Sequence, residues 1–102
     1  MIKDQKISVI GAGIGGLATA LALRLRGADV QVFEQAEVLG EVGAGLQISP
    51  NGLAVLKALG VGPQFRALGV RAKAVDLCDY RQGRLFCRLD IARYAPELEY
   101  NF

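Results

Sequence analysis

The feature that most constrains the fold of this chain is a glycine-rich turn near its start. The turn reads Gly-Ala-Gly-Ile-Gly-Gly over residues 11–16 and follows the apolar run 7–10. Gly11 lets the chain leave a strand in a tight turn, and Gly13 lets the backbone approach a pyrophosphate. Gly16 lets the following helix pack against the strand. The pattern therefore predicts a buried strand, covered on both faces, then a dinucleotide-binding turn and a helix.

The segments that follow the turn support this interpretation. Apolar residues recur at helical spacing over 14–26, and Gly27 fits the position that ends a helix. The apolar run 30–33 predicts a second strand, parallel to the first. Glu34 follows that strand, where an acidic residue accepts hydrogen bonds from ribose hydroxyls and repels a 2′-phosphate. The adenosine of FAD or NAD is therefore favoured over that of NADP.

A second glycine-rich run, Gly-Ala-Gly-Leu-Gln-Ile, occupies residues 43–48. Its small residues would let backbone approach a cofactor, but an ordinary loop into a short strand explains the pattern equally well. Ser49 and Pro50 then predict the N-cap and first position of a helix that Gly60 ends. The apolar face of this helix would comprise Leu53, Val55, Leu56 and Leu59.

The remaining sequence predicts shorter elements. Residues 63–68 indicate a helical turn, and alternating apolar residues over 70–80 and 84–89 indicate an antiparallel hairpin that turns at 81–83. A further helical turn is expected at 91–95. The predicted fold class is α/β: a Rossmann-like βαβ unit with a parallel sheet, followed by a helix and an antiparallel hairpin, in an incomplete domain.

The composition and charge of the chain argue against several other classes of function. The net charge of +2, with its lysines and arginines scattered, argues against nucleic acid or an anionic membrane as partner. The chain has no histidine, which excludes imidazole catalysis and imidazole metal sites, and no metal-ligand spacing occurs. Cys78 and Cys87 fall in neighbouring predicted strands and are expected to be free thiols. The chain is expected to be soluble and cytoplasmic, with its apolar N-terminal stretch belonging to the βαβ unit.

Together, residues 11–36 and 43–51 resemble the N-terminus of single-component FAD-dependent aromatic hydroxylases. These enzymes share the para-hydroxybenzoate hydroxylase fold and include salicylate hydroxylase, 3-hydroxybenzoate 6-hydroxylase and 6-hydroxynicotinate 3-monooxygenase. The run Gly-Ala-Gly-Leu-Gln-Ile-Ser-Pro-Asn is much more specific to this family than the first glycine turn, which many FAD and NAD proteins share.

The resemblance implies FAD as the cofactor and assigns a place along it to each matching position. The glycine turn would line the pyrophosphate, Glu34 would bind the adenosine ribose with Gln35 near the adenine, and residues 45–47 would lie nearer the flavin. The full set of implied cofactor-binding residues is Gly11, Ala12, Gly13, Ile14, Gly15, Gly16, Glu34, Gln35, Gly45, Leu46 and Gln47. No catalytic or metal-binding residue is assigned.

One position distinguishes branches of the family. In 6-hydroxynicotinate 3-monooxygenase the residue matching Gln47 is a histidine assigned as a catalytic base. A glutamine side chain does not take up a proton at neutral pH, so the base role is not carried over. The chain is therefore more similar to the salicylate and hydroxybenzoate branch.

The resemblance also implies the activity of the full-length proteins. NAD(P)H, which does not bind at the glycine turn, reduces the flavin, and one atom of O₂ is added to a small aromatic substrate. Residues 1–102 are expected to form the N-terminal part of an FAD-binding domain, without the substrate domain and inactive alone. Two alternatives stay open: part of another FAD- or NAD-dependent oxidoreductase, and a non-catalytic nucleotide-binding module. The residues do not indicate the substrate or the oligomeric state.

Overall fold

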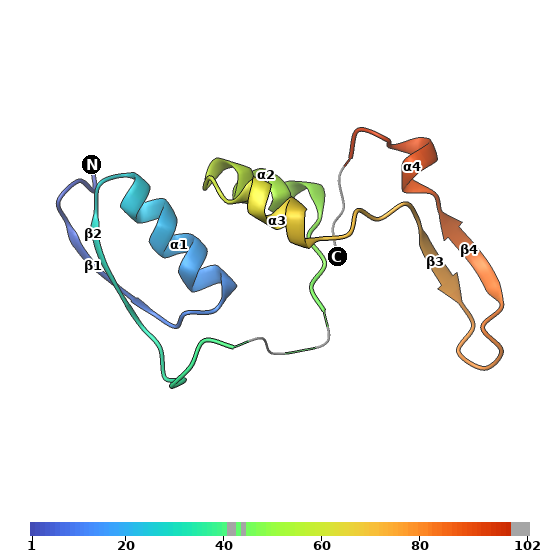
Figure 1. The fold of residues 1–102 in the computed structure, drawn as a ribbon, viewed down its shortest axis with the longest axis horizontal. Helices are drawn as coiled ribbons and strands as arrows, with labels where there is room; N and C mark the ends of the chain where they lie inside the picture. Colours follow the sequence, from blue (N-terminus) through green and yellow to red (C-terminus); the bar gives the residue numbers. More distant parts are fainter. Residues whose placement is uncertain (41–42, 44, 99–102) are drawn as a thin grey trace. The chain divides into compact units, whose positions relative to one another are not determined.

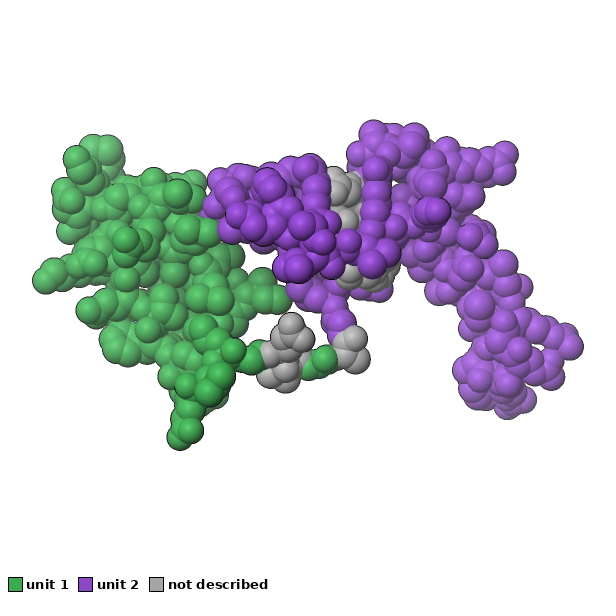
Figure 2. All heavy atoms as spheres, in the orientation of Figure 1, with its two compact units in different colours: residues 1–44 green, residues 45–102 purple. Residues whose placement is uncertain are grey.

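The computed structural model describes residues 1–40, 43 and 45–98. The chain forms two compact units, residues 1–44 and 45–102, shown in different colours in Figure 2. Each unit has its own secondary structure and is described by itself below.

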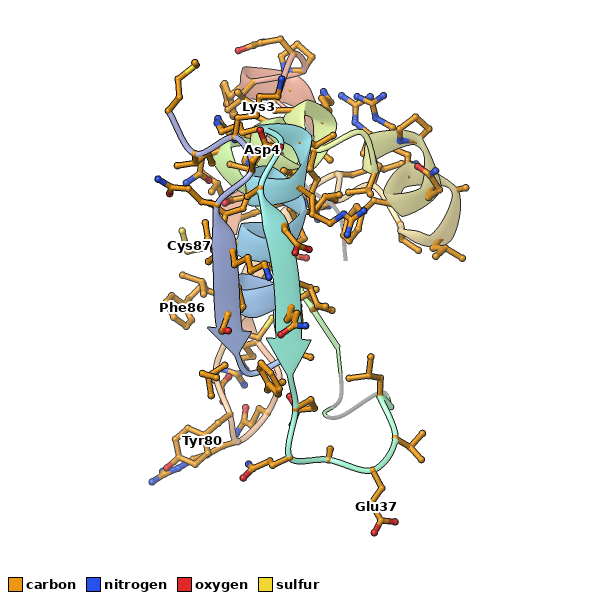
Figure 3. All side chains as sticks on the ribbon, turned by 90° about the vertical axis from the view of Figure 1, so that its left-hand side faces the viewer. Lys3, Asp4, Glu37, Tyr80, Phe86 and Cys87 are labelled. Atoms are coloured by element: carbon orange, nitrogen blue, oxygen red, sulfur yellow. The ribbon has the colours of Figure 1, made fainter. Side chains whose placement is uncertain are left out.

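The first unit is a βαβ unit. Strand β1 (Lys6–Ile10) leads into helix α1 (Ile14–Leu25), and the chain returns as strand β2 (Asp29–Phe33). The two strands pair in parallel, from Lys6 opposite Asp29 to Ile10 opposite Phe33. Helix α1 lies against one face of the pair (Figure 1), and it is behind the strands in the view of Figure 3. The predicted strand–helix–strand order and the parallel pairing are confirmed.

Helix α1 begins and ends close to the predicted residues. Gly13 is its N-cap in an extended conformation, and Ala20, with 7% of its surface exposed, is the buried residue where the helix meets the sheet. Gly27, at φ +87°, follows the helix in the left-handed region, and its N–H donates to the Arg24 carbonyl at 2.9 Å. The small residue at 20 and the glycine at 27 therefore have the roles that the sequence indicated.

The prediction that the first strand is buried on both faces was wrong. Ile7 and Val9 of β1 are half-buried, but Ile10 is 81% exposed, and Phe33 of β2 is 53% exposed. Within the described residues this sheet has two strands, and α1 covers one of its faces. A parallel strand is buried on both faces only where helices cover both faces of its sheet.

The second unit begins with two packed helices. Helix α2 (Pro50–Ala58) starts after Ser49 as predicted, and helix α3 (Gly62–Leu68) includes the expected turn. Leu53 is 1% exposed, but Val55 is 54% exposed, so the prediction that Val55 shares the apolar face was wrong. Two residues along a helix correspond to about 200°, which turns position 55 away from position 53.

The Ser49 cap also differs from the simplest expectation. The Ser49 hydroxyl donates to Asn51 Oδ1, and its side chain makes no capping hydrogen bond to the backbone of α2. The Pro50 ring fits the first helical position, where no backbone N–H is needed.

The predicted antiparallel hairpin is confirmed. Strand β3 (Val75–Cys78) pairs with strand β4 (Leu85–Leu89), from Val75 opposite Leu89, with a register shift after Leu77. The strand starts later than the alternation from residue 70 predicted. The Lys73 carbonyl accepts from the Ala92 N–H at 2.9 Å. The residues just before β3 are therefore bonded to the residues that follow β4 instead of to β4 itself.

The expected helical turn near the end of the chain is present as α4 (Ile91–Tyr94). The Asp90 side chain caps it by accepting from the Arg93 N–H at 3.0 Å, and Ile91 is 6% exposed. Among the described residues, no helix is both long and apolar enough to cross a bilayer.

Candidate dinucleotide-binding site

The glycine turn joins β1 to α1 at the carboxyl end of the two parallel strands. Gly11 has a φ of +99°, a conformation that residues with a side chain rarely adopt. Its N–H donates to the Phe33 carbonyl at 2.7 Å. The turn is therefore fixed to the end of β2, which is the edge of a parallel sheet where nucleotides bind in such folds.

The four glycines of the turn do not have equal surroundings. A Cβ added at Gly16 would lie 2.0 Å from the Gly11 carbonyl oxygen, so the start of α1 touches the turn itself. A Cβ added at Gly13 or Gly15 would meet no atom within 4 Å apart from its own neighbours in the chain and the backbone of α1. Space therefore lies open over these two residues, next to the first N–H groups of α1, which have no partner inside the helix. Such a surface accommodates a phosphate.

Glu34 supplies the acidic side chain at this edge. Its Oε2 accepts from the Ala12 N–H at 2.7 Å, and its Oε1 accepts from the Ala36 N–H at 2.9 Å. Backbone N–H donation, chiefly from Ala36 and then from Ala12, holds the pKa of the Glu34 carboxyl below its usual value. The side chain is therefore ionised at neutral pH. By contrast, the nearby Glu37 side chain points away from the loop that follows β2 (Figure 3).

The arrangement fits the ADP half of a dinucleotide. Amide donors and open space are present for the phosphates, and an ionised carboxylate is present for ribose hydroxyls. A carboxylate has about four acceptor positions, so Glu34 retains capacity beyond its two backbone partners. Among the residues that the structure describes, no group of three cysteine, aspartate or glutamate side chains gathers to hold a metal ion.

The structure places the predicted site residues in both units. It brings Gly11, Ala12, Gly13, Ile14, Gly15 and Gly16 together with Glu34, and Gln35 follows as an exposed residue. Gly45, Leu46 and Gln47 belong to the second unit, where they are exposed and lie outside helices and strands. Ala44, in the same glycine-rich run, lies outside the described residues. The ligand contacts of all these positions stay predictions.

Sequence reasoning missed the contact between Glu34 and Ala12. The residues are 22 positions apart, and nothing in their types indicates that they bond. Parallel pairing of the two strands supplies the signal, since it brings the residues that follow each strand to one edge.

Comparison with known proteins places this arrangement in a family. Residues 9–64 match the family model described as an NAD(P)-binding Rossmann-like domain. The chain belongs to this family. The match begins within β1 and ends within the first turn of α3, so this Rossmann-like chain carries the matching sequence in both of its units.

Two curated relatives are aromatic monooxygenases by name. The chain is 44% identical over 96 residues to 3-amino-4-hydroxybenzoate 2-monooxygenase of Streptomyces cremeus, covering 94% of this chain and 24% of that protein. It is 44% identical over 86 residues to 3-hydroxybenzoate 6-hydroxylase of Polaromonas naphthalenivorans, covering 84% and 22%. The chain thus spans about a quarter of the length of these relatives.

Two solved structures are also similar to this chain. HpxO of Klebsiella pneumoniae, solved with FAD and uric acid, matches with a TM-score of 0.76 and 30% identity over 95% of this chain and 25% of that chain. The tetrameric form of 2-methyl-3-hydroxypyridine-5-carboxylic acid oxygenase matches with a TM-score of 0.84 and 25% identity, over 97% and 25%. The predicted resemblance to FAD-dependent aromatic hydroxylases is confirmed, as is the α/β Rossmann-like fold class.

Proposed function

We propose that this chain is the FAD-binding segment of a flavin-dependent monooxygenase that hydroxylates an aromatic ring, and that its first unit holds the ADP half of FAD. The observation that carries the proposal is the edge where Glu34 meets the glycine turn, with open space over Gly13 and Gly15. The similarity to aromatic monooxygenases supports the same assignment.

In this proposal the chain binds and orients the cofactor. The N–H groups at the start of α1 bind the pyrophosphate, and the positive end of the helix dipole favours its charge. Glu34 accepts from the ribose hydroxyls, and its ionised carboxylate repels a 2′-phosphate. Gln35 lies near the adenine, and residues 45–47 lie along the FAD nearer its flavin. The flavin itself would supply the redox chemistry with NAD(P)H and O₂.

FAD is preferred over NAD or NADP as the resident nucleotide. The matching family model is described for NAD(P), but FAD and NAD share the ADP moiety that a glycine turn recognises. The related Klebsiella structure contains FAD, and another relative, 36% identical, is named an FAD-dependent urate hydroxylase. NAD(P)H would act as electron donor without occupying this edge.

The substrate class follows from the relatives. Their names specify hydroxybenzoates, an aminohydroxybenzoate and urate, which are electron-rich rings. We assign a small aromatic substrate of this kind to the whole protein. We expect residues 1–102, as the N-terminal part of the FAD-binding domain, to be inactive alone. A cytoplasmic location belongs to the same proposal, because two cysteines do not make the disulfide framework that is typical of small secreted domains.

A second candidate is a nucleotide-binding module without catalysis. The observation that favours it is the compactness of residues 1–44, which contain the glycine turn and Glu34 within one unit. A module of this kind would bind ADP as well as it binds FAD, because only the ADP half would be recognised. An FAD-binding segment gains further affinity from contacts made by residues 45–47.

Calorimetric titration of the chain with FAD, ADP, AMP and adenosine 2′,5′-bisphosphate tests the proposal. We expect FAD and ADP to compete for one site and FAD to bind more tightly. We expect the bisphosphate to bind more weakly than AMP, from which it differs only by the 2′-phosphate. The Glu34→Ala variant should lose roughly tenfold in affinity for ADP, since a charge-assisted hydrogen bond is removed. The Glu37→Ala variant is the matched control, because that side chain points away. Absence of FAD and ADP binding to the folded chain would refute the proposal, and equal affinities for the two would favour the module.

A further inference from the structure

We propose that Glu34 is also a positioning residue for the phosphate-binding turn: its carboxylate fixes the turn through the Ala12 N–H before any nucleotide binds. The inference rests on the proposed function and extends it, because it gives Glu34 an effect on the phosphates as well as on the ribose. It predicts that the turn loses its shape when this side chain is removed.

The contact that carries the inference is short and partly buried. Glu34 Oε2 accepts from Ala12 N at 2.7 Å, and Ala12 is 9% exposed. The preceding amide, that of Gly11, donates to the Phe33 carbonyl, also at 2.7 Å. Two consecutive N–H groups of the turn are therefore bonded to two consecutive residues at the end of β2. One of these bonds is made by backbone alone, and the other depends on the side chain.

The second carboxylate oxygen fixes the orientation of the first. Glu34 Oε1 accepts from the Ala36 N–H at 2.9 Å, so both oxygens have backbone partners. A carboxylate held at both oxygens cannot rotate away from Ala12 without losing a charge-assisted hydrogen bond. Since about four acceptor positions exist on a carboxylate, acceptor capacity remains for ribose hydroxyls. Holding the turn and binding the ribose are therefore compatible.

The turn needs such a restraint because of its composition. Four of its six residues are glycine, and glycine has more conformational freedom to lose than any other residue. Apart from their own neighbours in the chain, the Cβ positions of Gly13 and Gly15 have no atom within 4 Å, so no other segment packs against them there. A turn that is ordered in advance binds its ligand more tightly, since less freedom is lost on binding. Glu34 adds, through Ala12, to the order that the backbone bond between Gly11 and Phe33 supplies.

Amide hydrogen exchange of the ligand-free chain, followed by NMR, tests the inference directly. We expect the Ala12 amide to be protected in the wild type and to exchange at least tenfold faster in Glu34→Ala. The Gly11 amide should keep its protection, because its acceptor is a backbone carbonyl. Glu34→Gln should give an intermediate rate, since its amide oxygen retains one acceptor, and Glu37→Ala should match the wild type. Unchanged exchange at Ala12 in Glu34→Ala would overturn the inference.

Binding of inorganic pyrophosphate, which has no ribose, provides the second test. Removing a negative charge should by itself strengthen the binding of an anion. Weaker pyrophosphate binding by Glu34→Ala would therefore show loss of the ordered turn. If pyrophosphate binds as well or better while ADP binding weakens, the positioning role is wrong and the ribose role stands. If the wild type binds neither FAD nor ADP, the proposed function fails, and amide exchange still decides the positioning role.

Discussion

Replacement of Gly16 by alanine tests the packing at the start of α1. The added Cβ would lie 2.0 Å from the Gly11 carbonyl oxygen and 3.0 Å from its carbon. Both atoms belong to the backbone, so no side chain can turn aside, and the turn or the helix must move. Overpacking of this kind costs about 1–3 kcal/mol. A Cβ placed 2.0 Å from a backbone oxygen falls in the upper part of that range, about 2–3 kcal/mol. Alanine regains about 1 kcal/mol through its higher helix propensity, so we expect a net loss of roughly 1–2 kcal/mol in the free energy of unfolding of the first unit.

The matched control is Gly15→Ala, one residue earlier in the same helix. Outside the backbone of α1 itself, no atom lies within 4 Å of the Cβ position at Gly15, so this substitution adds helix propensity without a clash. We expect the first unit to keep its stability in this variant or to gain slightly. The pair therefore separates the effect of contact from the effect of residue type.

Amide exchange of β1 residues, whose protection depends on the first unit staying folded, measures the difference. A net loss of 1–2 kcal/mol should make these amides exchange roughly 5–30 times faster in Gly16→Ala than in the wild type. Urea titration followed by circular dichroism should show a lower midpoint for the same variant. Equal protection of β1 in both alanine variants would refute the packing argument.

Two further predictions concern the second unit. Leu53→Ala should destabilise the α2–α3 pair by about 2–5 kcal/mol, because Leu53 is 1% exposed, whereas Val55→Ala at a 54% exposed position should have little effect in the same urea titration. Asp79 accepts from the N–H groups of Arg81, Gln82 and Arg84 in the hairpin turn, and these bonds, chiefly from Gln82 and Arg84, lower the pKa of its carboxyl. Because the folded pKa lies below the unfolded one, this stabilisation is present above about pH 4 and is lost as the pH falls through the folded value. In the wild type, the Gln82 and Arg84 amides should therefore lose exchange protection at acidic pH. In Asp79→Ala they should already lack this protection at neutral pH. Equal protection of these amides in both proteins at neutral pH would contradict the prediction.

Local sequence patterns were sufficient for the order of the elements. Glycine at 11 and 27, proline at 50 and the alternation in the last third predicted the turn, the helix ends and the hairpin. These features depend on backbone conformation and on residues close in sequence. The sequence also predicted the family, because the second glycine-rich run is specific to FAD-dependent aromatic hydroxylases.

The wrong predictions concern burial and strand pairing, which depend on residues that are distant in the sequence. Ile10 was expected to be buried and is exposed, because the described residues supply a helix for only one face of its sheet. The strand expected from residue 70 starts at Val75, because Lys73 bonds to Ala92 instead of to β4. Apolar character shows that a residue favours burial, but it does not show which element covers it.

For the candidate site, the sequence by itself determined the residue types: glycines where the backbone must turn or be approached, and an acid after the second strand. Only the tertiary structure decided that the Glu34 carboxylate bonds to Ala12, that Gly16 touches the Gly11 carbonyl, and that Gly13 and Gly15 face open space. The physical reason is that parallel pairing of β1 and β2 brings both strand ends to one edge. Distances across that edge depend on the pairing register and on the packing of α1, which no local pattern contains.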